Sequence, residues 1–452
     1  MTAPAVPTAL QTIAAVRAGT TTSRAAVQAS LDRIAAVDGR LGAYQVLRAE
    51  KALAEAEEVD RRSDLDALPL AGLPIAVKDN VAVTGEPMRD GSAGTDPSPQ
   101  AEDHEVVRRR RAAGAVVVGI TRVPELSVFG ATDSVFGITR NPWDPSRTPG
   151  GSSGGSAAAV SSGTVAVAHG NDGMGSIRIP SACCGLVGIK PGLGTVPSQL
   201  WAGSWFEMSE NGPLGTTVSD VALVLSVMAA RPELADVVPA EAPLRVALSV
   251  RSPAIGSPVD RAWADAARST GDALAGAGHR VVEADPPYST GMMIAATARW
   301  MVGTAQDVEL LAHPERIERR VARHAALGRQ LARRGQPAES GRTRWRESAD
   351  RFFADHDVLV TPALAQRPIA ATRWGARGWL ANITSNSRYA PFAAPWNLAG
   401  WPAMTVPAGM HPQGTPVAVQ LVARPGGEAL LLRVAAQLEQ LRPWQRLAPD
   451  PA

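Results

Sequence analysis

The sequence predicts an α/β fold. Segments with the apolar spacing of helices alternate with short apolar runs of strand length. The 452 residues are enough to bury a large core, and no internal repeat or low-complexity linker divides them. With 19% charged residues and a net charge of +2, the composition gives no reason to expect nucleic acid or a membrane as partner.

The elements follow from these patterns in chain order. Helical spacing is found at about 8–60, at 104–113, after Ser156 and at 426–441. Runs typical of strands are found at 70–83, 115–120, 165–169, 357–362 and 417–422. Residues about 255–355 are helical and Arg-rich and carry no chemical motif, which predicts an insertion or cap.

Cysteine usage and the N-terminal segment indicate a cellular compartment. Cys183 and Cys184 are adjacent, which is poor geometry for a disulfide, so a reducing compartment is expected. The first residues show no basic segment followed by an apolar one, and no uncharged apolar stretch reaches about 18 residues. We therefore expect a cytoplasmic protein.

Lys78 is a candidate general base. Only three of the 45 lysines and arginines are lysines, and Lys78 lies in the apolar run 71–80. A desolvated lysine can lose its proton, whereas arginine cannot. A structural ion pair with Asp79 is the alternative. Lys51 fits a solvated helix face and Lys190 a structural position at a turn.

Two Gly-rich loops, 150–156 and 170–180, carry serines. The first lacks the Gly-Lys-Ser/Thr ending of a phosphate loop. It matches a nucleophile elbow centred on Ser153, which would require a downstream histidine. The candidates are His279, His313, His324, His356 and His411. Alternatively, its glycines allow close backbone approach.

The second loop places backbone N–H groups beside Ser176, where they could stabilise an oxyanion. Ser176 could act as a nucleophile if Ser152 or Ser153 passed its proton to Lys78. A Gly-rich turn with a helix-capping serine is the alternative. The residues alone do not establish that the three parts meet.

These motifs closely resemble the amidase signature family. The resemblance covers about 70–214 and resumes over about 357–441. It is most specific in Thr148–Ala159 and Gly175–Pro180. Further matching segments are Arg140–Asp144, Gly185–Pro191, Glu210–Leu214 and Trp396–Ala403.

The resemblance implies an α/β/α sandwich in which helices cover both faces of a large mixed central sheet. We expect a single domain over 1–452. Its parts are N-terminal helices at about 8–60, the signature core at about 66–220, the helical insertion or cap at about 255–355, and a C-terminal return to the core at about 357–445.

The resemblance also implies the site. Ser176 is the acylated nucleophile, Lys78 is the base, neutral when active, and Ser152 bridges them from a non-proline cis peptide. Backbone groups that would form the oxyanion hole lie at Gly173, Met174, Gly175 and Ser176. Supporting residues are Ser153, Asp172 and Arg178. The family uses neither a metal nor a cofactor.

One departure concerns the second loop, which in the family usually reads Gly-Thr/Ser-Asp-Thr-Gly-Gly-Ser. Here Asn171 replaces the first hydroxyl residue, Gly173 replaces the second Thr, and Met174 replaces the first Gly of the pair. We expect the Met174 side chain at the acyl pocket, and a positive φ there would be strained.

The predicted function is an amidohydrolase that gives a carboxylate plus ammonia or an amine from a small-molecule amide. Four tryptophans suggest an apolar or aryl acyl group: Trp201, Trp205, Trp396 and Trp401. A homodimer is a further hypothesis. The alternatives are a glutamine-dependent amidotransferase A-type subunit acting with a partner, and a binding or scaffold protein with a silent site.

Overall fold

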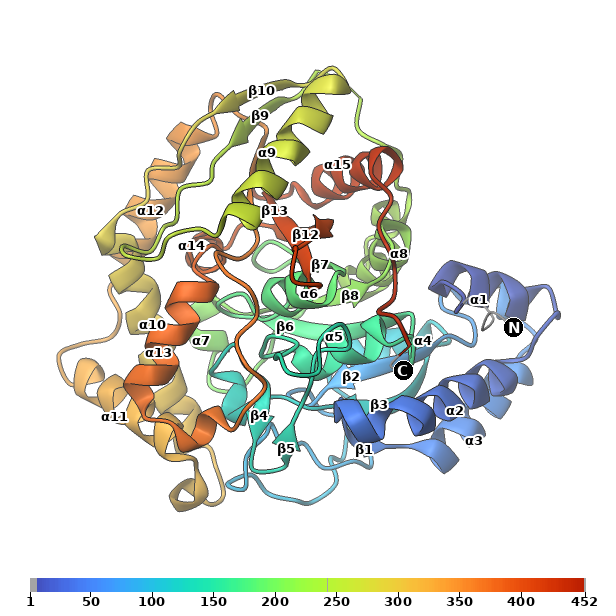
Figure 1. Cartoon of the computed structure of the whole chain (residues 1–452). Coiled ribbons are helices and arrows are strands. Elements are labelled where there is room, and N and C mark those ends of the chain that lie inside the picture. The colour runs from blue at the N-terminus through green and yellow to red at the C-terminus, as the bar shows by residue number, and fades with distance from the viewer. Residues whose placement is uncertain (1–5, 242, 451–452) are drawn as a thin grey trace.

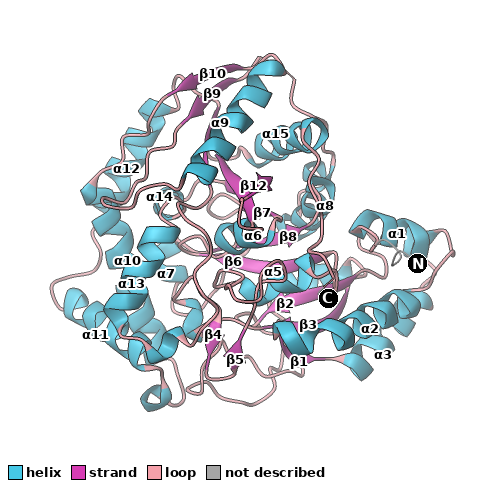
Figure 2. Ribbon diagram, in the orientation of Figure 1, coloured by secondary structure: helices cyan, strands magenta, loops and turns pink. Residues whose placement is uncertain are grey.

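An eleven-stranded mixed sheet runs through the molecule in the order β1-β3-β2-β6-β8-β7-β12-β13-β11-β9-β10 (Figure 1). The computed structural model describes residues 6–241 and 243–450. Helices cover both faces of the sheet (Figure 2), which confirms the predicted α/β/α sandwich.

The strands of the large sheet are short. They are β1 (Tyr44–Leu47), β2 (Pro74–Lys78), β3 (Val116–Thr121), β6 (Val167–Asp172), β7 (Val187–Lys190), β8 (Glu210–Gly215), β9 (Arg245–Leu248), β10 (Arg280–Glu283), β11 (Val358–Pro362), β12 (Ala403–Met410) and β13 (Pro416–Val422). A separate hairpin pairs β4 (Asp133–Ser134) with β5 (Gly137–Ile138).

The helices are α1 (Ala9–Arg17), α2 (Ser23–Leu41), α3 (Ala49–Asp60), α4 (Glu105–Ala112), α5 (Gly154–Ser161), α6 (Arg178–Cys184), α7 (Ser204–Glu207), α8 (Val218–Ala229), α9 (Arg261–Gly276), α10 (Thr290–Glu309), α11 (Arg319–Ala332), α12 (Glu339–Phe352), α13 (Trp379–Tyr389), α14 (Ala394–Ala399) and α15 (Glu428–Leu441). Helices α5 and α6 pack on one face of the sheet, and α8, α9 and α15 pack on the other.

Strands β2, β3 and β6 are paired in parallel and fully buried. Strand β2 lies between β3 and β6 and is parallel to both. All residues of these three strands are buried. Strands covered on both faces have continuous apolar runs, which is why the sequence shows them clearly. Lys78 ends β2, so the sheet itself carries it into the interior.

The predicted all-helical segments differ from the structure in two places. Strand β1 interrupts the N-terminal helices, and β10, inside the predicted insertion, pairs with β9 at the edge of the main sheet. Both strands have four residues, and β10 is mostly exposed, so neither has an apolar run long enough to read. The helical cap therefore begins after β10, with α10, α11 and α12, which lie with α13 at the left of Figure 1.

Among the helices of the described residues, none has both the length and the apolar character needed to cross a membrane. Cys183 and Cys184 are buried free thiols.

Close contact between α10 and α11 depends on Gly328. A Cβ added at Gly328 would lie 1.9 Å from the Met301 carbonyl oxygen. We expect Gly328→Ala to force the helices apart and to lower the free energy of unfolding by about 1–3 kcal/mol. Chemical denaturation measures this.

Gly39 is the matched control, because it is exposed in α2 and an added Cβ would meet nothing within 4 Å. Gly39→Ala should be neutral or stabilising by about 0.5–1 kcal/mol. Equal destabilisation by both substitutions would contradict the close α10–α11 contact.

Candidate active site

Lys78 lies at the centre of the site. Its Nζ donates to Ser152 Oγ at 2.7 Å and to Asn171 Oδ1 at 3.1 Å, and lies 3.4 Å from the Asn171 carbonyl oxygen. Lys78 and Ser152 are fully buried. The structure thus brings together the predicted base and the predicted bridging serine, from β2 and the first Gly-rich loop.

Burial allows the Lys78 amine to lose its proton near neutral pH. Removal from water lowers the pKa of Lys78 to about 7, while the charges of Asp90 and Asp172 act in the opposite direction. Burial also raises the pKa of Asp90 well above its ordinary value, which weakens that opposition.

Asp79 makes no ion pair with Lys78; its Oδ1 accepts from the Arg89 N–H at 2.9 Å. A purely structural ion pair with Asp79 is therefore not what holds Lys78.

The two serine loops are joined through Ser153. The peptide bond between Gly151 and Ser152 is cis. The Ser153 N–H donates to the Ser176 carbonyl oxygen at 3.2 Å, and Ser153 Oγ lies 3.3 Å from both the N and the O of Asn171. Ser153 therefore spans the first loop, the end of β6 and the second loop.

Ser176 is placed by the residue that follows it. Ile177 packs over glycines of three neighbouring strands, where added Cβ atoms would lie 2.9–3.0 Å from its side chain: Gly170, Gly188 and Gly212. Side chains at these positions would lift the loop from the sheet. Ser176 itself is 8% exposed, and its hydroxyl makes no hydrogen bond within the described part of the chain. The hydroxyl is thus unengaged, and within the same residues no hydrogen bond joins it to Ser152, the predicted bridging serine.

The second loop is fixed by a buried ion pair. Asp172 accepts from Arg178 Nε and Nη2, both at 2.9 Å, and from Asn397 Nδ2 at 2.8 Å. Burial opposes ionisation, but the charge and hydrogen bonds of Arg178, together with the bond from Asn397, hold the pKa of Asp172 well below its ordinary value. Arg178 Nη1 also donates to Gln420 Oε1 at 2.6 Å. The pair therefore ties β6 and α6 to α14 and β13.

The backbone N–H groups of this loop divide into two kinds. The N–H of Gly175 donates to Asp172 Oδ1 at 2.6 Å, so, contrary to the expectation, it is not available to an oxyanion. Within the described residues the N–H groups of Gly173, Met174 and Ser176 make no hydrogen bond, and they are the available donors. The positive φ falls on Gly175 (116°), not on Met174, so the expected strain at Met174 is absent.

Tryptophans occupy two different environments. Trp201 and Trp205 line a cavity of about 20 Å³ that also touches Asn80 and Asn171. Trp396 and Trp401 instead pack against Phe353, with ring centroids 5.9 and 5.2 Å away. Only the first two tryptophans are therefore placed to contact a substrate. The half-buried Met174 packs with the same apolar cluster as Trp201.

The nucleophile-elbow alternative lacks its histidine. In the described residues no hydrogen bond joins Ser153 to any of the five downstream candidates. His279 bonds Gln437, for example, and His324 bonds Trp379. Nor does any group of three or more His, Cys, Asp or Glu side chains there have the arrangement of a metal site.

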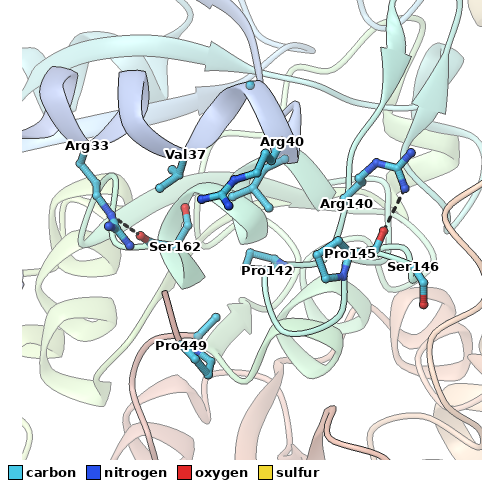
Figure 3. Close-up of a pocket in the computed structure, with 12 residues that line it drawn as sticks. Arg33, Val37, Arg40, Arg140, Pro142, Pro145, Ser146, Ser162 and Pro449 are labelled. Atoms are coloured by element: carbon cyan, nitrogen blue, oxygen red, sulfur yellow. Dashed lines mark hydrogen bonds between the residues drawn. The ribbon is translucent and has the colours of Figure 1, made fainter. Parts of the chain in front are cut away.

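A separate cavity of about 540 Å³ lies beside α2 (Figure 3). Arg33 there donates to the Ser162 carbonyl oxygen at 3.0 Å, and Arg140 to the Pro145 carbonyl oxygen at 2.9 Å. It contains none of the predicted catalytic residues, so the candidate active site is the Lys78 cluster.

The sequence matches the protein family described as Amidase over residues 25–432. It is 40% identical over 441 residues to a protein of Mycobacterium tuberculosis (strain ATCC 25618 / H37Rv) named amidase AmiB2, covering 96% of this chain and 95% of that one. The chain belongs to the amidase family.

Two further relatives support amide cleavage. The chain is 32% identical over 462 residues to an acylamidase of Rhodococcus erythropolis, covering 93% of this chain and 92% of that one. The solved structure of 6-aminohexanoate cyclic dimer hydrolase matches with a TM-score of 0.91 and 29% identity, covering 98% of both chains. This amidase is an enzyme that hydrolyses amide C–N bonds.

Three polar residues of the amidase site were missed from the sequence. Asn171 was seen only as a departure from the family loop, yet it accepts from Lys78. Asn397 lies inside a family-like segment but had no assigned role, and Gln420 had no signal beyond being polar in an apolar strand. A polar residue within a buried run is the signal that could have identified Gln420.

Removing Arg178 should destabilise the amidase severely. Arg178→Met would leave the Asp172 carboxyl buried without its partner, which costs about 3–5 kcal/mol. We expect a loss of that size in the free energy of unfolding, measured by denaturant titration. Arg245→Met is the control, because Arg245 pairs with Asp357 at the surface, and the change should be far smaller. Similar losses would contradict the role of the buried pair.

Proposed function

We propose that this amidase hydrolyses small-molecule carboxylic amides through an acyl-enzyme on Ser176, with Lys78 as base and Ser152 as proton relay. The observation that carries this proposal is the 2.7 Å contact between Lys78 Nζ and Ser152 Oγ, made by a buried lysine whose pKa is lowered to about 7. A lysine that is neutral at working pH can accept a proton.

In acylation, Ser176 Oγ attacks the carbonyl carbon and gives its proton to Ser152, which gives its own to neutral Lys78. The N–H groups of Gly173 and Met174 stabilise the oxyanion of the tetrahedral intermediate. When the C–N bond breaks, the proton returns from Lys78 through Ser152 to the leaving nitrogen. Ammonia or an amine departs and leaves the ester on Ser176.

Deacylation repeats the relay with water. Water gives a proton through Ser152 to Lys78 as its oxygen attacks the ester carbonyl. Collapse of the intermediate returns the proton from Lys78 through Ser152 to Ser176 Oγ and releases the carboxylic acid, which gives its proton to solvent to become the carboxylate. Asp172, Arg178 and Ser153 support the loops and exchange no proton with the substrate.

The substrate is a small-molecule amide with an apolar acyl group. The walls that Trp201 and Trp205 give to the cavity support an apolar group, and the relatives include an acylamidase. A cytoplasmic location and a homodimeric state stay predictions from the sequence. Glutaminase activity that needs a co-purifying partner would favour the amidotransferase alternative instead.

Lys78→Arg tests the base. Guanidinium stays protonated, so we expect a folded variant whose kcat/KM is lower by about 10²–10⁴-fold between about pH 6 and 10. Wild-type kcat/KM should rise with pH through about 7, because the protonated form of Lys78 that dominates below its pKa cannot accept a proton. Lys51→Arg, at an exposed lysine that pairs with the buried Glu86, should leave the pH profile unchanged. If Lys78→Arg retained a tenth or more of wild-type activity, Lys78 would have a structural role and would not be the base.

Substitution of the serines one at a time tests the nucleophile. Ser176→Ala should abolish turnover and labelling by a fluorophosphonate, and Ser152→Ala should lower kcat by about 10²–10⁴-fold as the relay is cut. Ser153→Ala should have the mildest effect. Mass spectrometry of the labelled protein locates the adduct. An adduct on Ser152 or Ser153 would overturn the assignment.

A further inference from the structure

The Trp205 indole is clamped between the second serine loop and the cap. A Cβ added at Gly173 would lie 2.3 Å from Ser209 Oγ and 2.7 Å from Trp205 Cε3, on the six-membered ring. One added at Gly303 of α10 would lie 2.7 Å from Trp205 Cδ1, on the five-membered ring. Side chains larger than glycine at these positions would therefore clash with Trp205. The sequence departure at Gly173 thus has a steric reason.

Polar contacts fix the orientation of the ring. Trp205 Nε1 donates to Asp307 Oδ2 at 2.7 Å, and the Ala202 N–H donates to Asp307 Oδ1 at 3.2 Å. Asp307 is 3% exposed and lies one turn after Gly303 on α10. One helix turn of the cap therefore supplies both the space and the hydrogen-bond acceptor for Trp205.

The backbone that carries Trp205 is strained. Residues 204–207 have four consecutive positive φ values, 52°, 53°, 58° and 60°. Non-glycine residues keep this conformation only where their surroundings fix it, and such segments cluster at functional sites. Arg342 of α12 donates to the Phe206 carbonyl oxygen and, at 3.2 Å, to Glu207 Oε2. The cap thus holds this segment from two helices.

The ring forms a wall of the cavity beside the catalytic lysine. Its volume of about 20 Å³ is the space of about one water molecule. It reaches Asn171, which accepts from Lys78. With Trp205 in place, a substituent of a substrate that entered this cavity beside Asn171 would have very little room.

We propose that Trp205 is a specificity-determining residue that limits the acyl group to about acetyl or propionyl size, and that Gly173, Gly303 and Asp307 are positioning residues that hold its ring. This rests on the proposed amide hydrolysis. The acyl side is assigned because the loop that binds the carbonyl oxygen is the loop against which the ring packs. The acyl group stays at that loop throughout both half-reactions, whereas the amine leaves.

The test compares kcat/KM for 4-nitroanilides of acetic, butyric and benzoic acids. Trp205→Ala should raise the ratio of benzoyl to acetyl activity at least about 10-fold, and Trp205→Phe should lie between it and wild type. Trp444→Ala is the control: this half-buried indole bonds the Thr216 carbonyl oxygen at 3.0 Å and lines a different cavity, so the ratio should stay within about 2-fold.

Gly303→Ala provides a second measurement in which no cavity-lining residue is substituted. Its methyl group would lie 2.7 Å from Trp205 Cδ1 and shift the ring, so the benzoyl-to-acetyl ratio should differ from the wild-type ratio by more than about 2-fold. An unchanged ratio in these Trp205 and Gly303 variants would overturn the proposal. A change confined to a series of N-substituted acetamides would also overturn it, because the cavity would then receive the amine. Failure of the wild type to cleave any amide or to react with a fluorophosphonate would instead remove the proposed function, and the acyl assignment with it.

Discussion

The buried pair of Asp172 and Arg178 is the interaction on which the site depends. Both side chains are buried, and each is compensated by several hydrogen bonds, some of which come from distant parts of the chain. Taking two charges out of water is costly, so such a pair is stable only where its geometry is complete. The hydrogen bonds of this pair to Asn397 and Gln420 join helix α14 and strand β13 to the loop that carries Ser176.

Lys78 shows the opposite use of burial. Its surroundings provide hydrogen-bond acceptors in Ser152 and Asn171 but no close carboxylate partner, so removal from water favours the neutral amine. The interior therefore stabilises the charged form of Asp172, which has Arg178 as its partner, and disfavours the charged form of Lys78, which has no close carboxylate partner. A fixed charged pair positions the loop, and the lysine without a close carboxylate is the base of the proposed mechanism.

The cap helices hold Trp205 in place beside the site. Helices α10 and α12 hold a strained segment whose indole packs on the serine loop, so residues more than a hundred positions apart meet at one cavity. In the proposed mechanism the reacting groups lie at the end of β2 and in the two serine loops, whereas Trp205, the proposed specificity residue, lies in α7 and is held by the cap. Under this proposal the acyl preference can change without a change in the relay.

Local sequence pattern is enough to predict the buried strands, the two serine loops and Lys78. Strands β2, β3 and β6 have continuous apolar runs because both of their faces are covered, and the serine loops and Lys78 are recognised from residue type. The four-residue strands β1 and β10 cannot be predicted in this way, because they lack an apolar run. The residue types also could not distinguish Trp205, at the cavity, from Trp396, in the core, since both are large buried aromatics. Tertiary structure decided that difference, the partners of Arg178 more than 200 residues away, and the reason for Gly173, because contacts between distant segments leave no periodic trace in the chain.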